Sequence, residues 1–182
     1  MPEIKHVVFN HKDPAHQTHL EELQQERSHD RARYNLTKRW AGNEEHRATP
    51  LENFIAARIE DEKEAIRDDL EGKDEPTGTQ FVLQYLDGKP VGFTKYRQGD
   101  RPFINFMFVK PDMRETLGYE EPLYDGNGAF LGMKPPSRKR AEPLLLAKKM
   151  IDFLTKVEGA APGSSPTSEQ GARIMEKYLG AD

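Results

Sequence analysis

Residues 132–154, GMKPPSRKRAEPLLLAKKMIDFL, carry the clearest fold signal in the chain. Leu146, Met150, Phe153 or Leu154, and Val157 follow one another at three- and four-residue steps, the spacing of a helix with one buried face. Pro143 suits the first turn of that helix, because its missing N–H costs nothing there. A strand is expected just before, over residues 129–133. The stretch therefore predicts a strand, a loop and a helix in succession.

The predicted loop is basic, with Lys134, Arg138, Lys139 and Arg140 close together. A basic loop at a helix N-terminus favours a bound anion, because free amides and the helix dipole both attract negative charge. Residues 131–160 hold seven basic and three acidic residues, whereas residues 60–75 hold nine acidic and three basic. The simpler interpretation of the loop is a basic loop on an ordinary α/β protein, and that of the acidic segment is a solvated helix face.

The amino-acid composition limits which classes of protein the chain can belong to. The chain has 182 residues, 35% of them hydrophobic and 32% charged, which predicts one polar domain. A net charge of −4 gives no general reason to expect a nucleic-acid partner, and the absence of cysteine excludes disulfides and thiolate chemistry. The start lacks the apolar region of a signal peptide, and no apolar run is long enough to span a membrane. We therefore expect a cytoplasmic, intracellular protein.

The first part of the chain predicts a strand over residues 4–9 and then two helices. The first helix starts at Asp13, an N-cap residue, and runs toward Trp40. It is poorly amphipathic, so we expect it either to break near Asn35 or to lie against another chain. The second helix is expected to begin with a capping box of Thr49 and Glu52 and to end at residue 72.

All six histidines lie in the first 46 residues. His16 and His19 are three residues apart on a predicted helix and could share a metal ion. No third ligand has a suitable spacing, so the histidines are interpreted as surface residues.

The middle of the chain predicts a β-hairpin, with strands over residues 80–86 and 90–96 around an Asp87-Gly88 turn. A third strand over residues 103–109 is apolar nearly throughout, so we expect it to be central and covered on both faces. Residues 110–128 are interpreted as an irregular insertion. A last helix is expected over residues 168–180, after a small polar linker.

Three segments in this order resemble the GNAT superfamily of N-acetyltransferases. Residues 86–96, LDGKPVGFTKY, are similar to the second and third strands of the family. Residues 133–143, MKPPSRKRAEP, are similar to its V-x-P-x-x-R-x-x-G-x-G/A loop, and residues 165–180 to its last helix. The resemblance covers residues 80–180 and implies an α/β (α+β) fold, in which helices flank a mixed, mostly antiparallel central sheet that lacks the last strands of the family.

In this family the loop amides cradle the pyrophosphate of acetyl-CoA, and the thioester is presented where two strands splay apart. The resemblance therefore implies acetyl-CoA as the cofactor. The implied cofactor-binding residues are Met133, Arg138, Lys139, Arg140, Ala141, Glu142 and Leu144. Transfer of acetyl to an amine needs a base for the ammonium and an acid for the departing thiolate. Tyr178 and Glu176 are the implied candidates for this proton transfer.

The chain departs from the family pattern at several positions. Ala141 replaces the first loop glycine, and Pro143 removes one potential N–H donor. Glu176 stands where the family commonly has the tyrosine that acts as the general acid. Tyr178, two residues further along, is expected to point off that face of the helix. A second V-x-P-x-x-R sequence ends at Arg114, which leaves two candidates for the cofactor loop.

These departures keep a second hypothesis open, in which a GNAT-like domain (residues 1–159, a linker or weak strand at 160–167 and a helix at 168–182) has lost catalysis. It would then be a structural or interaction protein within a larger assembly, for example a phage particle. A sheet without its last strands leaves an edge that a partner protein or a second copy could complete. Nucleic-acid binding through the basic loop is a third hypothesis, against which stand the acidic net charge and the lack of aromatic residues among the bases.

Overall fold

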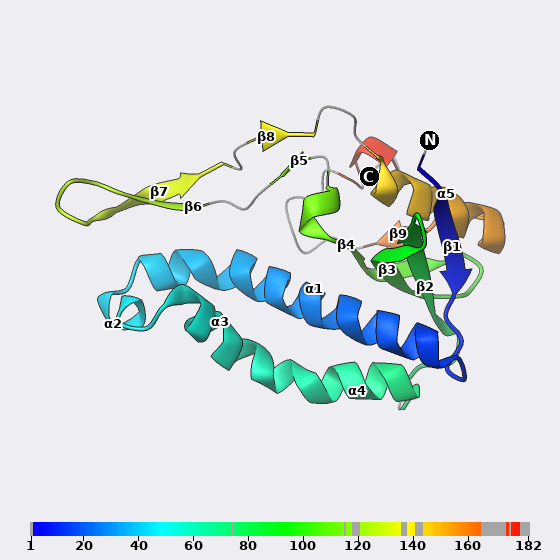
Figure 1. Ribbon diagram of the computed structural model, residues 1–182. Coiled ribbons are helices and arrows are strands. Elements are labelled where there is room, and N and C mark those ends of the chain that lie inside the picture. Colours follow the sequence, from blue (N-terminus) through cyan, green and yellow to red (C-terminus); the bar gives the residue numbers. More distant parts are fainter. Residues whose placement is uncertain are drawn as a thin grey trace.

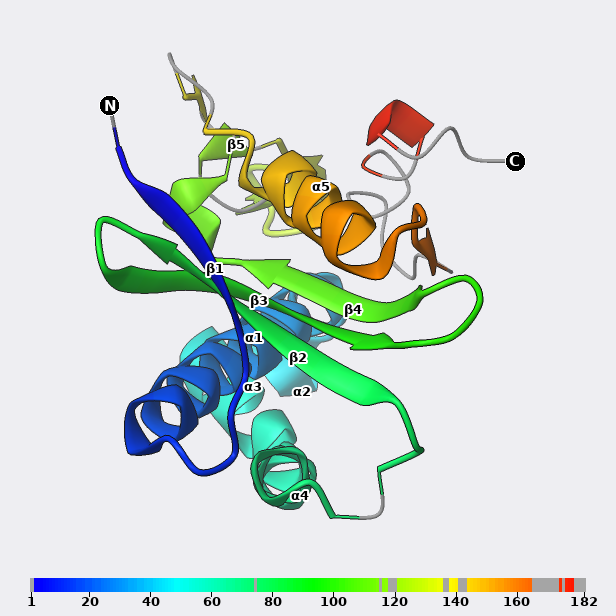
Figure 2. The same cartoon turned by 90° about the vertical axis from the view of Figure 1, so that its right-hand side faces the viewer.

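The computed structural model describes residues 2–73, 75–114, 116–117, 121–135, 138–140, 144–164, 174 and 176–178. Within these residues the fold is a mixed α/β arrangement around a five-stranded sheet. Helices α1, α3 and α4 lie on one face of the sheet and helix α5 lies on the other (Figures 1 and 2). The predicted α/β class with a mostly antiparallel sheet is confirmed.

The strands of the main sheet lie in the order β1-β2-β3-β4-β9. Their bounds are β1 Ile4–Val8, β2 Thr79–Leu86, β3 Lys89–Arg97, β4 Phe103–Val109 and β9 Gly163–Ser164. Neighbours are antiparallel except for β4 and β9, which are parallel. The Asp87-Gly88 turn joins β2 to β3 as predicted, with φ of 48° and 81° that suit a tight hairpin turn.

Helix α1, Pro14–Ala41, is unbroken over 28 residues and is capped by Asp13. The expectation of a break near Asn35 is therefore wrong. The alternative, contact with another chain, is not needed to explain its polarity, because α1 covers the protein's own sheet. Its apolar residues Leu20 and Leu23 join a core cluster with Phe81, Leu83 and Phe93 of the sheet.

The acidic segment that follows is divided into shorter pieces. These are α2 Glu44–Arg47, α3 Leu51–Ile59, the 3₁₀ turn η1 Glu60–Glu62 and α4 Lys63–Glu71. The predicted capping box is absent, since no side chain caps the start of α3. The Glu52 carboxylate instead contacts His29 at 2.8 Å and Arg33 at 2.9 Å, both on α1. Gly72 ends α4 in the left-handed conformation, as expected.

Strand β4 is less covered than predicted. Phe103 and Asn105 are exposed, whereas Ile104, Phe108 and Val109 are buried. The two exposed residues alternate with the buried Ile104, so they share one face of the strand, and that face is little covered at the start of β4 by the described residues. The expectation of a strand covered throughout on both faces is therefore wrong.

The segment between β4 and α5 is not the irregular insertion that was expected. It contains η2 Pro111–Met113, β5 Thr116–Leu117, β6 Glu121–Tyr124, β7 Phe130–Lys134 and β8 Arg138–Lys139. Strands β6 and β7 form a hairpin that extends along the C-terminal half of α1, away from the main sheet (Figure 1). Strand β7 agrees with the predicted strand to within one residue.

Helix α5, Leu146–Glu158, packs through Met150, Ile151 and Leu154 on Val82, Tyr96 and Ile104 of the sheet. Ile174 and Tyr178, from the expected last helix, pack against the same cluster. No helix in the described ranges is both long and apolar enough to cross a membrane.

Candidate functional site

The basic residues singled out from the sequence do not lie at the N-terminus of α5. Arg138 and Lys139 form strand β8, which pairs with β5, and both side chains are exposed. Helix α5 begins only at Leu146. The helix therefore starts three residues later than the expected start at Pro143, and Arg140 precedes it by six residues. Ala141, Glu142 and Pro143 lie outside the described residues, so their predicted roles stay predictions.

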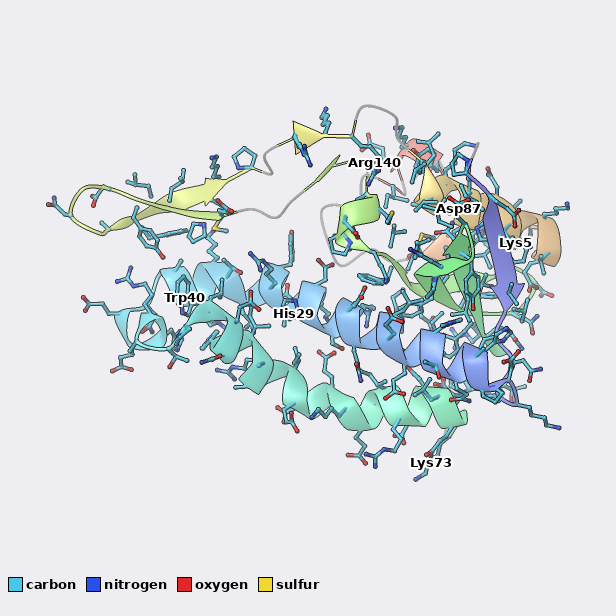
Figure 3. The ribbon with its side chains drawn as sticks, in the orientation of Figure 1. Lys5, His29, Trp40, Lys73, Asp87 and Arg140 are labelled. Carbon is cyan, nitrogen blue, oxygen red and sulfur yellow. The ribbon has the colours of Figure 1, made fainter. Side chains whose placement is uncertain are left out.

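Arg140 lies at the end of β4, next to the second candidate arginine (Figure 3). Its guanidinium donates hydrogen bonds to the backbone carbonyls of Asp112 and Arg114, the latter with an N–O distance of 3.5 Å. The sequence left open which of two V-x-P-x-x-R-like sequences, the one ending at Arg114 or the one ending at Arg138, marks the cofactor loop. The fold brings the arginine-rich ends of both to the same place.

Arg114 is already engaged by the fold. Its Nε donates to the carbonyl of Val109 at 2.9 Å, and its terminal nitrogens contact the Asp30 carboxylate at 2.8 and 3.4 Å. Both side chains are mostly buried, with 22% and 18% of their surface exposed. Arg114 therefore holds the end of β4 against α1 and has little charge left for a ligand.

The N-terminus of α5 has the features of an anion site that the basic loop lacks. No side chain of the described residues caps it, and its first turn contains no acidic residue. Lys148 and Lys149 lie in that turn, where positive charge is unfavourable to the helix dipole unless an anion offsets it. The buried Gln84 fixes this turn to the sheet, because its Nε2 donates to the carbonyl of Leu146 at 2.9 Å.

Two further predicted cofactor residues lie in different parts of the fold. Leu144 is half-buried and packs against the cluster of Val91, Val109 and Leu146. Met133 lies on β7, paired with Pro122 of β6, and is half-buried. Leu144 is thus next to the start of α5, whereas Met133 belongs to the hairpin.

The edge of β4 toward β9 is open beyond Ile104 in the described part of the chain. The N–H of Lys110 donates a hydrogen bond to the carbonyl of Val91 on β3. Backbone groups of successive residues in an antiparallel strand point alternately to its two edges. The N–H and C=O of Met107, three residues earlier, therefore point away from β3 and toward the open edge. The register of β4 shifts between Ile104 and Phe106, just before Met107. Among the described residues, the β4–β9 pairing therefore lies just before this change of register.

The two candidate proton-transfer residues differ in placement. Tyr178 is half-buried and packs on the core cluster between α5 and the sheet, together with Met107. Glu176 is exposed. Tyr178 thus faces the body of the protein, and its expected departure from the helix face that the family uses stays a prediction.

The histidines have structural contacts. His16 Nδ1 accepts from the backbone N–H of Asn10 at 3.0 Å, and a ring nitrogen of His19 lies 2.8 Å from the Tyr85 hydroxyl. Their proposed sharing of a metal is not supported, because no group of three ligating side chains among the described residues could hold a metal ion. Five of the six histidines are half-buried, so the surface interpretation is correct only for His11.

Sequence reasoning missed Gln84, Asp30 and Met107, although these residues shape the end of the sheet. Gln84 interrupts the apolar run over residues 81–86, and this is the signal that could have drawn attention to it. Comparison with family models, curated proteins and solved structures gives no match to this chain.

Proposed function

We propose that the protein is a GNAT-like, acetyl-CoA-dependent N-acetyltransferase. The observation that carries this proposal is the parallel pairing of β4 with β9, linked through α5, which brings the chain after the helix back beside β4. The resemblance drawn from the sequence implies a thioester presented beside such a strand pair, and Met107 lies on the same edge of β4 a little further along. The proposal thus rests on topology more than on the basic loop.

The residues present fit part of this ligand. The amides at the start of α5, beside Leu144, are capped by no described side chain and suit a pyrophosphate, with exposed Arg138 and Lys139 close by in sequence as countercharges. Arg114 and Arg140 fit less well, because their guanidinium groups are bound to Asp30 and to backbone carbonyls. We therefore assign these two arginines to holding the loop and not to holding phosphate.

Acetyl-CoA would supply the activated acetyl group. In the transfer the amine forms the new C–N bond as the C–S bond to the thiolate breaks, so a proton must reach sulfur. Tyr178 is the better candidate for this acid, since it is half-buried on the β4–α5 cluster, and Glu176 is the alternative.

Calorimetric titration with acetyl-CoA and CoA tests the proposal. We expect micromolar binding that is lost in Arg138→Glu/Lys139→Glu, because two exposed countercharges become repulsive. The matched control is Lys12→Glu/Lys73→Glu, which changes the net charge equally at exposed positions elsewhere and should bind normally. Tyr178→Phe should bind and lose turnover. No heat at millimolar ligand with a folded protein contradicts the proposal.

A second candidate function, an interaction protein within a larger assembly, is favoured by the β6–β7 hairpin. A two-stranded hairpin alone is marginally stable, and this one exposes 43% of Leu123 and 66% of Leu131. Arg47 holds it against the end of α1, with its guanidinium carbon 5.5 Å from the Tyr124 ring centroid. Such an arm would suit contact with another protein, for example in a viral particle.

Light scattering distinguishes this second function. Leu123→Ser/Leu131→Ser should leave the unfolding transition unchanged and abolish any self-association or partner binding, because both side chains are exposed. A parent protein that stays a lone monomer and has no affinity for candidate partners argues against it. Loss of acetyl-CoA binding in the same variant would instead tie the hairpin to the first function.

A further inference from the structure

The edge of the sheet at β1 is distinct from the β4 edge discussed above. β1 is the outermost strand of the described sheet, with α5 above the sheet and the α1 layer below (Figure 2). Glu3 accepts from the N–H of Asp87, and the N–H of Phe9 donates to Phe81, so the odd-numbered residues face β2. By alternation, the backbone groups of Ile4, His6 and Val8 point outward from the sheet.

This edge lacks the usual protection against an added strand. Residues 4–8 contain no proline, and the β1–β2 register runs without a bulge. The lysine on the strand, Lys5, lies 3.0 Å from Glu3, so its charge is paired. Val8 exposes 42% of its surface. The strand therefore offers three outward backbone pairs to a partner.

A groove of about 440 Å³ runs beside this edge. We call it the β1–α5 groove; it is lined by Pro2, Ile4, His6, Lys149, Asp152, Phe153 and Lys156. Its floor is apolar and aromatic, since the His6 ring stacks on Phe153 with centroids 4.9 Å apart. Ile4 and His6 are alternate residues, so their side chains lie on the same face of the strand.

The charge of the groove is positive. Its one acidic residue, Asp152, lies 2.9 Å from Lys148 and is already paired. Lys149 and Lys156 are exposed, and neither forms an ion pair with another described residue. They are seven residues apart on α5, which places them about 10 Å apart along the helix axis. Acidic side chains two to four residues apart on an extended peptide span about 7–13 Å.

We propose that the β1–α5 groove binds an extended acidic segment of a partner protein, which adds to β1 as a further strand. Backbone hydrogen bonds to Ile4, His6 and Val8 supply affinity, and alternate carboxylates of the segment meet Lys149 and Lys156. The residues between those carboxylates point to the other face of the added strand, away from α5. This interaction does not depend on acetyl-CoA, and it involves the strand at the opposite end of the sheet from β9.

Fluorescence anisotropy of the full chain with a labelled (Val-Glu)₄ peptide tests this site. We expect saturable binding, weakened about tenfold or more by Lys149→Glu/Lys156→Glu. The Lys12→Glu/Lys73→Glu control carries the same net charge and should bind as the parent does; Figure 3 shows Lys73 at the far end of α4. A (Val-Lys)₄ peptide should not bind.

A backbone variant tests strand addition separately from charge. Val8→Pro removes one outward N–H and leaves the bonds to β2 in place, so it should weaken the peptide, whereas Val8→Thr should not. Peptide should also slow hydrogen exchange at the amides of Ile4, His6 and Val8. If Val8→Pro fails to fold, the Lys149→Glu/Lys156→Glu variant and the hydrogen-exchange data still test whether the peptide adds to β1.

Several results would overturn the proposal. Equal weakening in the remote lysine control would reduce the effect to net charge. Unchanged exchange at the three β1 amides in the bound state would exclude strand addition. If the protein forms a dimer in the absence of peptide and Val8→Pro dissociates that dimer, the β1 edge binds a second copy of the chain and not a partner segment. Displacement of the peptide by acetyl-CoA would assign the groove to the cofactor, and that result would leave the proposed function standing.

Discussion

The guanidinium of Arg114, at the exit of β4, lies 2.8 Å from the carboxylate of Asp30 in the middle of α1. This ion pair joins the sheet to the helical layer. Lys110, on the same exit, adds contacts to Glu22 at 3.2 Å and Glu26 at 3.5 Å. Three acidic residues at four-residue steps on α1 therefore face two bases that follow β4, and charge aligns the long helix on the sheet.

Breaking this pair should destabilise the fold before it affects any ligand. We expect Arg114→Met to lower the free energy of unfolding by about 2 kcal/mol, because it leaves a mostly buried carboxylate without its cation. Asp30→Asn should cost less, since its amide oxygen still accepts. Urea unfolding of both variants and of the double variant measures the coupling, and Arg39→Met, at an exposed position of α1, is the control. Normal stability in Arg114→Met combined with lost acetyl-CoA binding would identify Arg114 as a cofactor residue instead.

A second charged cluster lies between α4 and β3. The ammonium of Lys95 contacts Asp69 at 2.8 Å and Glu75 at 2.9 Å, and each of the three side chains exposes 16% or less of its surface. Hydrogen bonds from Glu75, Lys95 and Gln24 outweigh burial and lower the pKa of Asp69. Burial and the neighbouring Asp69 raise the pKa of Glu75. One carboxylate is thus stabilised as an anion and the other is not.

The two carboxylates should therefore respond differently to neutral replacement. Asp69→Asn should lower the free energy of unfolding at pH 7 by about 3 kcal/mol, whereas Glu75→Gln should stay within about 1 kcal/mol of the parent. The stabilisation from Asp69 is present above its unfolded pKa, near 3.8, and is lost as the pH falls through its lower folded pKa. For Glu75 the sign is opposite: stability falls as the pH rises from about 4.5 through its higher folded pKa. Chemical unfolding between pH 3 and pH 8 measures both, and equal losses at pH 7 would contradict this assignment.

Gly92 of β3 should not tolerate a side chain. A β-carbon placed there would lie 2.6 Å from the carbonyl oxygen of Phe108 and 3.2 Å from Oε1 of Gln84. The first contact is with backbone and cannot relax cheaply. Gly92→Ala should therefore lower the free energy of unfolding by about 2–3 kcal/mol. Gly88→Ala provides a comparison, because its open turn position involves φ strain but no contact. A thermal melt of Gly92→Ala that matches the parent would show that β3 and β4 can separate.

Local chemistry decides which parts of this fold are predictable from sequence. The Asp87-Gly88 hairpin is specified by two adjacent residues, and the helix α5 by apolar spacing, so both were found. Strand β6 was missed although turn residues follow it at positions 125–128, because Glu121–Tyr124 contains a charge and a proline and shows no apolar alternation. The expectation of a break in α1 was wrong because the buried surface of this helix includes polar residues. Gln24 and Ser28 are buried, and their side chains donate hydrogen bonds to Asp69 and Glu62. Periodicity counts such residues as solvated.

The candidate site stays a prediction, and the structure bears only on where its residues lie. A basic loop before a helix indicated an anion site, but the first turn of α5 begins beyond Arg140 because residues 138–139 pair with β5. Strand pairing of this kind is a long-range contact that spacing along the chain does not encode. The residues that position the site, Gln84 and Asp30, belong to elements far away in sequence. Their role depends on tertiary contacts alone.

The start of α5 carries one further testable feature, the left-handed backbone of Leu145. Its φ is 53°, a conformation that costs a non-glycine residue about 1 kcal/mol. The side chain is 39% exposed, so its removal loses little buried surface. At most positions alanine is the more stabilising of the two small residues, because glycine loses more backbone entropy. At Leu145 we expect the reverse order, with Leu145→Gly more stable than Leu145→Ala by about 1 kcal/mol in urea unfolding. If Leu145→Ala is instead the more stable variant, Leu145 adopts an ordinary helical backbone, and the amides at the start of α5 begin at a different residue.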